Sequence, residues 1–245
     1  MTPKFWTTSL VFLVRVRCLI FLGVSVRLGK YHSLTFDCDG VVLDSNKVKT
    51  EAFYRTTLPY GESAAQAMVD YHVANGGISR YKKFAYFLEQ IAPTHANLQQ
   101  GPYLEELLQV YADHVREGLL SCDMAPGLET LRQQTPNARW LIVSGGDQAE
   151  LRDVFAQRGI VDWFDGGIFG SPDTKDEILA RELVSGNIQQ PALFLGDSKY
   201  DYQAASVAGL DFVFLSGWSE VDNWQVWVAR MGLSHAVSIQ CLLQP

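Results

Sequence analysis

The sequence predicts an α/β fold in which a parallel sheet core carries an inserted all-helical domain. Short apolar strand patterns alternate with helical patterns along much of the chain, which is typical of βαβ units. The stretch 44–123 departs from this alternation, because it contains helical patterns and no strand pattern. With 245 residues, of which 47% are hydrophobic, the chain can bury a core in each of two such parts.

The first predicted strand spans residues 33–36 and ends at Asp37-Cys38-Asp39-Gly40, where acids and glycine stop the apolar run. Further strands are predicted at 139–143, 167–169, 192–195 and 212–215, with helices at 148–157, 174–184 and 200–208. Beyond Gly217 the chain is rich in tryptophan, which favours a closing helix packed on the sheet. These elements predict a mostly parallel sheet.

Four helical patterns are predicted between the first and second strands, at 46–58, 63–74, 80–91 and 103–117. Glycine and proline separate them at Gly76-Gly77 and at Gly101-Pro102. We therefore expect a catalytic core made of residues 31–43 and 124–245, a helical cap domain over 44–123, and an N-terminal extension over 1–30.

The charge distribution limits the classes of partner. The net charge is −7, yet residues 1–30 carry five basic residues and no acid, so residues 31–245 carry −12. An acidic body argues against nucleic-acid binding. The four cysteines are scattered and predict neither a disulfide framework nor a zinc site, which favours a reducing, cytoplasmic location.

Residues 10–28 are strongly apolar, but Arg15 and Arg17 interrupt them. Each arginine would cost about 2.5–3.5 kcal/mol at the centre of a bilayer, which argues against a membrane-spanning helix. Three interpretations of residues 1–30 stay open: a loosely ordered or wrongly translated extension, a signal or membrane anchor, and a structural element.

Charged and polar residues follow the predicted strands at their carboxyl ends, where open parallel sheets bind ligands. Alternate residues of a strand share a face, so Asp37 and Asp39 project together while Cys38 points into the packing. The later strands are followed by Ser144-Gly145 before a helix, by Lys175 at the start of a helix, and by Asp197 and Asp201. Hydroxyl, backbone amides and lysine suit an oxyanion such as phosphate.

The predicted site holds four carboxylates and one lysine, so a hard divalent cation is needed to offset their repulsion. Mg²⁺ is the usual choice where phosphate is the other partner. A nucleophilic aspartate, a second aspartate that moves a proton, a metal and a phosphate cradle are the parts of a phosphoryl-transfer site with a covalent intermediate.

These motifs resemble the haloacid dehalogenase superfamily of hydrolases, in the branch with a helical cap inserted after the first strand. The resemblance spans residues 33–215 and rests on Phe36-Asp37-x-Asp39-Gly40-Val41, followed by Asp44-Ser45, Ser144-Gly145, Lys175 and Gly196-Asp197-x-x-x-Asp201. It implies a Rossmann-like core and a Mg²⁺-dependent phosphatase acting on a small phosphorylated metabolite, similar to phosphoglycolate phosphatase and β-phosphoglucomutase. Gly145-Gly146 departs from the Asn-Gly that the family often has at this position.

The resemblance also implies roles for single residues. Asp37 attacks phosphorus, and Asp39 protonates the leaving oxygen and then activates water. Ser144, Gly145 and Lys175 hold the phosphate. Mg²⁺ is bound by Asp37, by the carbonyl of Asp39 and by Asp197, with Asp201 in support.

Substrate choice is expected to depend on the cap, where Gly76-Gly77 leads into a cationic segment with Arg80, Lys82 and Lys83. Arg80 and Lys47 are the candidate specificity residues; a solvated basic helix face is the other interpretation of the segment. A phosphomutase of the β-phosphoglucomutase type uses the same acids and stays an alternative. A receiver-like domain that only accepts a phosphoryl group is the non-enzyme alternative, and the inserted domain argues against it. The sequence indicates no oligomeric state.

Overall fold

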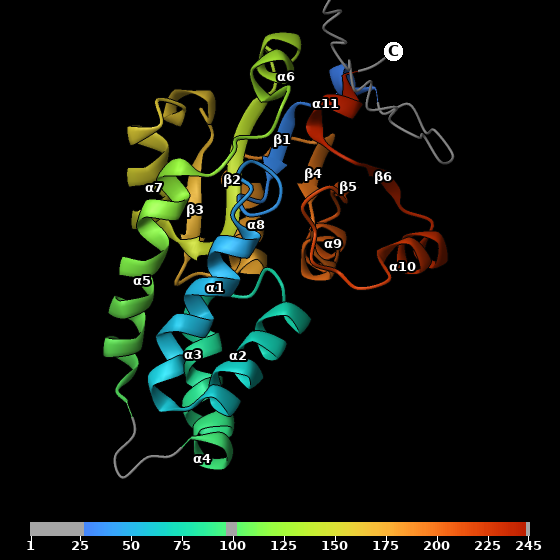
Figure 1. The fold of residues 1–245 in the computed structure, drawn as a ribbon. Helices are drawn as coiled ribbons and strands as arrows, with labels where there is room; N and C mark the ends of the chain where they lie inside the picture. Colours follow the sequence, from blue (N-terminus) through green and yellow to red (C-terminus); the bar gives the residue numbers. More distant parts are fainter. Residues whose placement is uncertain (1–26, 97–101, 244–245) are drawn as a thin grey trace, which may run out of the picture.

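The computed structural model describes residues 27–96 and 102–243 and has an α/β fold built on one parallel sheet (Figure 1). All five predicted strands are present, and a sixth, not predicted, pairs with the last of them. Their bounds are β1 Ser33–Phe36, β2 Arg139–Asp147, β3 Gly167–Ser171, β4 Ala192–Gly196, β5 Asp211–Leu215 and β6 Ser234–Ala236. The predicted Rossmann-like core is confirmed.

The strand order is β3-β2-β1-β4-β5-β6, so β1 lies inside the sheet between β2 and β4. From β1 the chain first adds strands on one side and then, starting with β4, on the other. The strand order therefore reverses between β1 and β4, and in such sheets the crevice for a ligand opens at the carboxyl ends of these two strands. Asp37 follows β1, and Asp197 follows β4.

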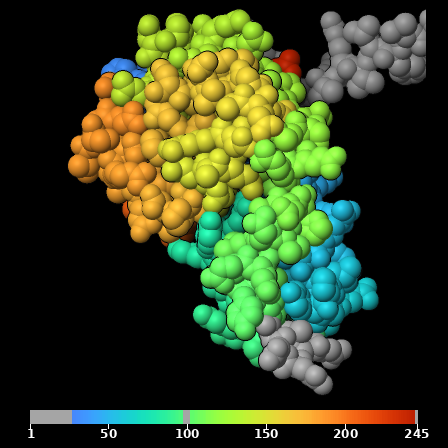
Figure 2. Space-filling model, turned by 90° about the vertical axis from the view of Figure 1, so that its left-hand side faces the viewer, coloured from blue at the N-terminus to red at the C-terminus, as the bar shows by residue number. Residues whose placement is uncertain are grey.

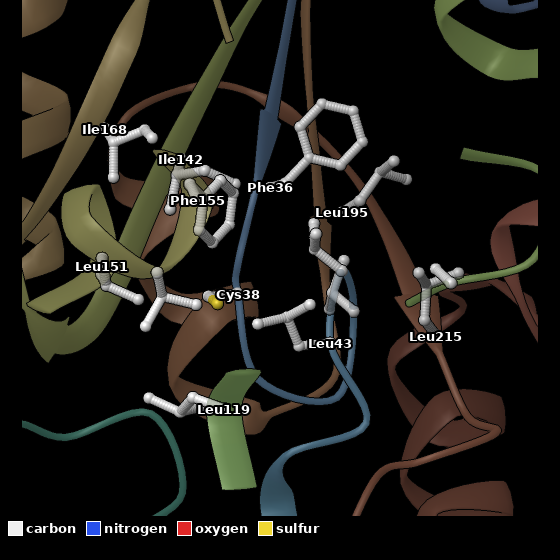
Figure 3. Packing of buried hydrophobic residues seen from close by; sticks show 14 of the residues in the cluster. Phe36, Cys38, Leu43, Leu119, Ile142, Leu151, Phe155, Ile168, Leu195 and Leu215 are labelled. Carbon is white, nitrogen blue, oxygen red and sulfur yellow. The ribbon is translucent and has the colours of Figure 1, made fainter. Parts of the chain in front are cut away.

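Helices cover both faces of the sheet. On one face α6 Leu128–Gln134, α7 Gln148–Gln157 and α11 Ile239–Leu242 pack on strand residues that include Phe36, Ile142 and Leu195 (Figure 3). On the other face α8 Lys175–Val184 and α9 Lys199–Val207 pack on residues that include Leu141 and Phe194. This alternation of apolar side chains between the faces fixes the register of each strand.

The tryptophan-rich segment forms α10 Trp224–Met231, which packs on β5 as expected. The rings of Trp224 and Trp227 lie 5.7 and 5.2 Å from the ring of Phe214. Short 3₁₀ turns complete the core at η1 Leu28–Lys30 and η4 Val161–Trp163.

As far as the structure describes them, residues 44–121 form helices and no strand, and we call this segment the helical insert. Its elements are α1 Asn46–Thr57, η2 Leu58–Tyr60, α2 Glu62–Ala74, α3 Arg80–Tyr86, the π-helical turn η3 Phe87–Ile91, α4 Ala92–His95 and α5 Leu104–Ser121. The insert has its own aromatic centre, in which the ring of Phe53 lies 5.1 Å from Phe84 and 4.4 Å from Tyr111.

The insert forms a layer beyond the carboxyl ends of the strands and is seen from the side as a narrower lobe below the core (Figures 1 and 2). Two ion pairs join it to α7 of the core. Arg80 pairs with Glu150 at 2.5 Å, and Arg116 pairs with Asp153 at 2.7 Å. The insert is therefore fastened over the end of the sheet that carries the acids.

The interpretations of the N-terminal extension concern residues that lie mostly outside the described part of the chain. Of residues 1–30 the structure describes only 27–30, where Leu28 is buried and Lys30 pairs with Asp211 at 2.9 Å. Within the described residues, none of the helices combines the length and apolar character that crossing a membrane requires.

Candidate active site

The end of β1 delivers two acids to the same side of the chain. Cys38 is fully buried in the hydrophobic core, as predicted (Figure 3). Asp37 and Asp39, its neighbours on either side, both line the cavity under the insert. The chain then turns at Gly40 with a φ of 71°, a conformation that glycine adopts without strain.

Asp37 is 3% exposed and contacts Lys175, the first residue of helix α8. The ammonium of Lys175 lies 2.8 Å from its Oδ2, and the Cys38 amide donates to its Oδ1 at 2.7 Å. Burial raises the pKa of Asp37 to about 7, and the positive charge of Lys175 opposes that rise. A cation near Asp37 thus favours the ionised form, which is the nucleophilic form of a carboxyl group.

Asp39 lies between a hydroxyl and an ammonium of the insert. Ser45 donates to its Oδ1 at 2.6 Å, and Lys49 of α1 forms an ion pair with its Oδ2. Burial favours the neutral acid, but Lys49 and Ser45 outweigh it and lower the pKa of Asp39. The two neighbouring aspartates are thus held in different electrostatic environments.

Asp197 and Asp201 follow β4 and lie beside the nucleophile candidate. Asp201 closes the first turn of α9, where its Oδ2 accepts from the Ser198 amide at 3.0 Å and from the Ser198 hydroxyl at 2.7 Å. Its other oxygen contacts Lys175. Asp197 accepts from the side-chain amide of Asn46 at 2.7 Å. A Cβ at position 40 would lie 2.1 Å from Asp197 Oδ2, so glycine is required there.

One oxygen from each of three buried carboxylates, Asp37, Asp197 and Asp201, lies within 4.8 Å of the others. Lys175 is the only lysine or arginine that pairs with these acids among the described residues. Burial and the charges of Asp201 and Asp37 raise the pKa of Asp197 well above its usual range. Buried, clustered oxygen donors with excess negative charge fit a hard divalent cation such as Mg²⁺.

The end of β2 brings its glycines against the insert. The strand runs to Asp147, beyond its predicted end at 143, so Ser144 lies within the strand; Asp147 caps α7, which begins at Gln148 as predicted. Ser144 is fully buried, and its hydroxyl accepts from the Gly146 amide at 3.0 Å. Gly145 lines the cavity, and a Cβ there would lie 2.3 Å from the Gly77 carbonyl of the insert. This close approach explains why a side chain is absent at position 145.

Core and insert enclose a cavity of about 60 Å³. Its core wall includes Asp37, Asp39 and Asp197, and its insert wall includes Lys49, Arg80 and Lys83. Ser144, Lys175 and Asp201 are fully enclosed, with exposures of 0 to 1%.

The two candidate specificity residues differ in position. Arg80 lines the cavity and also pairs with Glu150. Lys47 is exposed on α1 and is not part of the cavity lining that the described residues form. Residues that the sequence reasoning did not assign to the site are Asn46, Lys49, His72, Lys83 and Glu220. The nearest signal for Asn46 and Lys49 was their position just after the first acids, and for Lys83 its place in the cationic segment, but neither shows which side chains face inward. His72 and Glu220 carried no such signal.

Comparisons with known proteins identify the family and the fold. The family model of haloacid dehalogenase-like hydrolases matches residues 31–209. A search of curated proteins finds no match. A predicted phosphatase from Clostridium acetobutylicum aligns with a TM-score of 0.63 at 15% identity, over 86% of this chain and 95% of its own.

Two further solved structures have similar folds. CbbY from Rhodobacter sphaeroides, in complex with phosphate, has a TM-score of 0.62 at 15% identity, over 87% and 96% of the two chains. A predicted phosphoglycolate phosphatase from Haemophilus somnus has a TM-score of 0.62 at 14% identity, over 76% and 86%. At such low identities these structural similarities support the fold alone. The family match covers most of the chain and includes Asp37, Asp39, Asp197 and Asp201. The chain therefore belongs to the haloacid dehalogenase-like hydrolases.

Proposed function

We propose that the protein is a Mg²⁺-dependent phosphatase that hydrolyses a small phosphorylated metabolite through a covalent intermediate on Asp37. The observation that carries the proposal is the meeting of Asp37 and Asp39 with Lys175, Asp197 and Asp201 where the strand order reverses. The names of similar structures, which include phosphatases, support the same activity.

Asp37 is the proposed nucleophile. Its carboxylate attacks phosphorus, an O–P bond forms, and the bond from phosphorus to the leaving oxygen breaks. Lys175, 2.8 Å from the carboxylate, favours the ionised form and offsets the charge of the incoming phosphate. The proposed phosphate contacts are Lys175, the Ser144 hydroxyl and the Gly145 backbone.

Asp39 is the proposed acid and base. The negative charge of a bound phosphate raises the pKa of Asp39 and favours its protonated form, which donates a proton to the leaving oxygen. The resulting carboxylate then accepts a proton from the water that hydrolyses the aspartyl-phosphate. Water supplies the oxygen of the released phosphate, and both aspartates return to their starting states. Ser45 and Lys49 hold Asp39 in place for both steps.

Asp37, the carbonyl of Asp39 and Asp197, with Asp201 in support, are the residues proposed to hold Mg²⁺. When bound, the ion supplies positive charge that offsets the repulsion between the carboxylates and the phosphate. The helical insert, which lies over the same cavity, is proposed to act as the cap that excludes water and selects the substrate.

The test is phosphate release from a panel of phosphorylated metabolites with Mg²⁺ or with excess chelator. Wild type is expected to release phosphate only with Mg²⁺, and Asp37→Asn is expected to be inactive although folded. Asp162→Asn, an exposed acid in the core, is the matched control and is expected to keep wild-type activity. Full activity with chelator, or an active Asp37→Asn, would contradict the proposal; a strict need for a sugar bisphosphate would indicate a phosphomutase instead.

A further inference from the structure

Helix α3 presents two of its cations to the cavity and one to the outside. Arg80 and Lys83, three residues apart, share a helix face and are both buried, at 6 and 2% exposure. Lys82, between them, is exposed. The cationic segment is therefore only partly a solvated surface.

Most charged groups around the cavity already form an ion pair or a hydrogen bond with another side chain. Lys49 pairs with Asp39, and Arg80 pairs through both terminal nitrogens with Glu150. The core acid Glu220 accepts from the hydroxyl of Thr50 at 3.1 Å.

Lys83 differs, because its ammonium meets no carboxylate in the part of the chain that the structure describes. Its Nζ lies 2.6 Å from His72 Nδ1 and 3.5 Å from the His72 carbonyl oxygen. His72 is 8% exposed, and its Nε2 is buried without a hydrogen-bond partner among the described residues. A buried amine without a counter-charge and a buried imidazole nitrogen without a partner are both costly, unless a ligand satisfies them.

We propose that Lys83, positioned against His72, binds a second anionic group of the substrate, on the leaving-group side of the phosphate ester. The inference rests on the proposed phosphatase activity and names the class of substrate: a phosphate monoester whose leaving group carries a carboxylate or another phosphoryl group. A charge-assisted bond to Lys83 supplies the missing counter-charge, and the buried nitrogen of His72 gains a polar partner.

The position of Lys83 and the state of its amine agree with this assignment. Lys83 and His72 line the same cavity as Asp37 and Asp39, so an anionic group on the leaving-group side can reach them. Burial and the charge of Lys49 lower the pKa of Lys83 to about 7. An anion bound to Lys83 favours the protonated amine.

The experiment compares kcat/KM, with Mg²⁺, for three esters that differ in the leaving group: phosphoglycolate, ethylene glycol monophosphate and ethylene glycol bisphosphate. Wild type is expected to prefer phosphoglycolate over ethylene glycol monophosphate, whose leaving group carries no charge. In Lys83→Met this preference is expected to fall roughly 10- to 100-fold, mainly through KM. Lys82→Met, on the exposed face of the same helix, is expected to keep the wild-type preference.

The possible outcomes separate the inference from the activity on which it rests. Equal kcat/KM for all three esters in wild type, or an unchanged preference in Lys83→Met, would overturn the role of Lys83 while leaving the phosphatase intact. A preference for the bisphosphate would identify the second anion as a phosphoryl group. If wild type hydrolyses none of the esters, calorimetric titration decides: tighter binding of phosphoglycolate than of the monophosphate, lost in Lys83→Met, supports the subsite, and equal binding refutes it.

Discussion

The carboxylate of Asp39, at the end of the central strand, forms an ion pair with Lys49 in the first helix of the insert. Only 9% of the Lys49 side chain and 15% of the Asp39 side chain are exposed. A residue of the insert thus contacts the proposed acid and base directly, so that this ion pair links the insert to the proposed chemistry of the core.

Substitution Lys49→Met is expected to move the pH profile of kcat to higher pH. Lys49 lowers the pKa of Asp39, so its removal raises that pKa, and a higher pH is then needed to ionise the base. The expected displacement is about 1 to 3 pH units. Arg55→Met, at an exposed position of the same helix, is the control and should leave the profile in place. Superimposable profiles for Lys49→Met and wild type would show that the ion pair does not set the pKa of Asp39.

Substitution Arg80→Met is expected to lower the free energy of unfolding by about 3–5 kcal/mol, because it leaves the carboxylate of Glu150, whose side chain is only 10% exposed, without its partner. The double variant Arg80→Met with Glu150→Met is expected to be more stable than Arg80→Met alone, since no unpaired charge remains. Urea titration measures both.

The matched control for Arg80 is the exposed pair of Arg55 and Glu51 on α1, with side chains 60 and 56% exposed. Arg55→Met is expected to cost at most about 0.5 kcal/mol, the usual worth of such a pair. Equal losses for the buried and the exposed arginine would contradict the role of Arg80 in fastening the insert to α7.

The buried amine of Lys83 predicts a pH-dependent stability. Its pKa is about 7 in the folded protein and about 10.5 when exposed, so the unfolded chain binds one more proton between these values. The free energy of unfolding of wild type, relative to Lys83→Met, is therefore expected to rise with pH in this window by about 1 kcal/mol per pH unit. Denaturant titrations at about pH 7.5 and about pH 9.5, both inside this window, measure the difference in the free energy of unfolding.

The charged groups near Lys83 are Lys49, Asp39, Glu220 and Lys175. A difference that does not change with pH would show that Lys83 is protonated throughout.

The core of the site was predictable from the sequence because its determinants are local. The alternation of side chains along a strand places Asp37 and Asp39 on one side and Cys38 on the other, and parallel strands bring their carboxyl ends to one edge. Strand β6, Ser234–Ala236, was not predicted, because its three residues lack an apolar pattern and it depends on pairing with β5.

The insert wall of the cavity was not predictable in the same way. Which of Arg80, Lys82 and Lys83 turns inward depends on how α3 packs against the rest of the insert and on the close approach of Gly77 to Gly145. Such contacts join residues far apart in the chain, and the helical pattern of one short segment does not specify them. The same holds for Lys49, which a local pattern does not distinguish from the exposed Lys47.

The measurement that tests the central claim most directly is mass spectrometry of the protein after a rapid acid quench during turnover with Mg²⁺ and phosphoglycolate or an aryl phosphate. The expected result is the mass of one added phosphoryl group, mapped to Asp37, that increases in Asp39→Asn because hydrolysis of the intermediate slows. Asp37→Asn is expected to carry no such group. Release of phosphate without a phosphorylated form in either wild type or Asp39→Asn, or a phosphoryl group on a different residue, would contradict the covalent mechanism at Asp37.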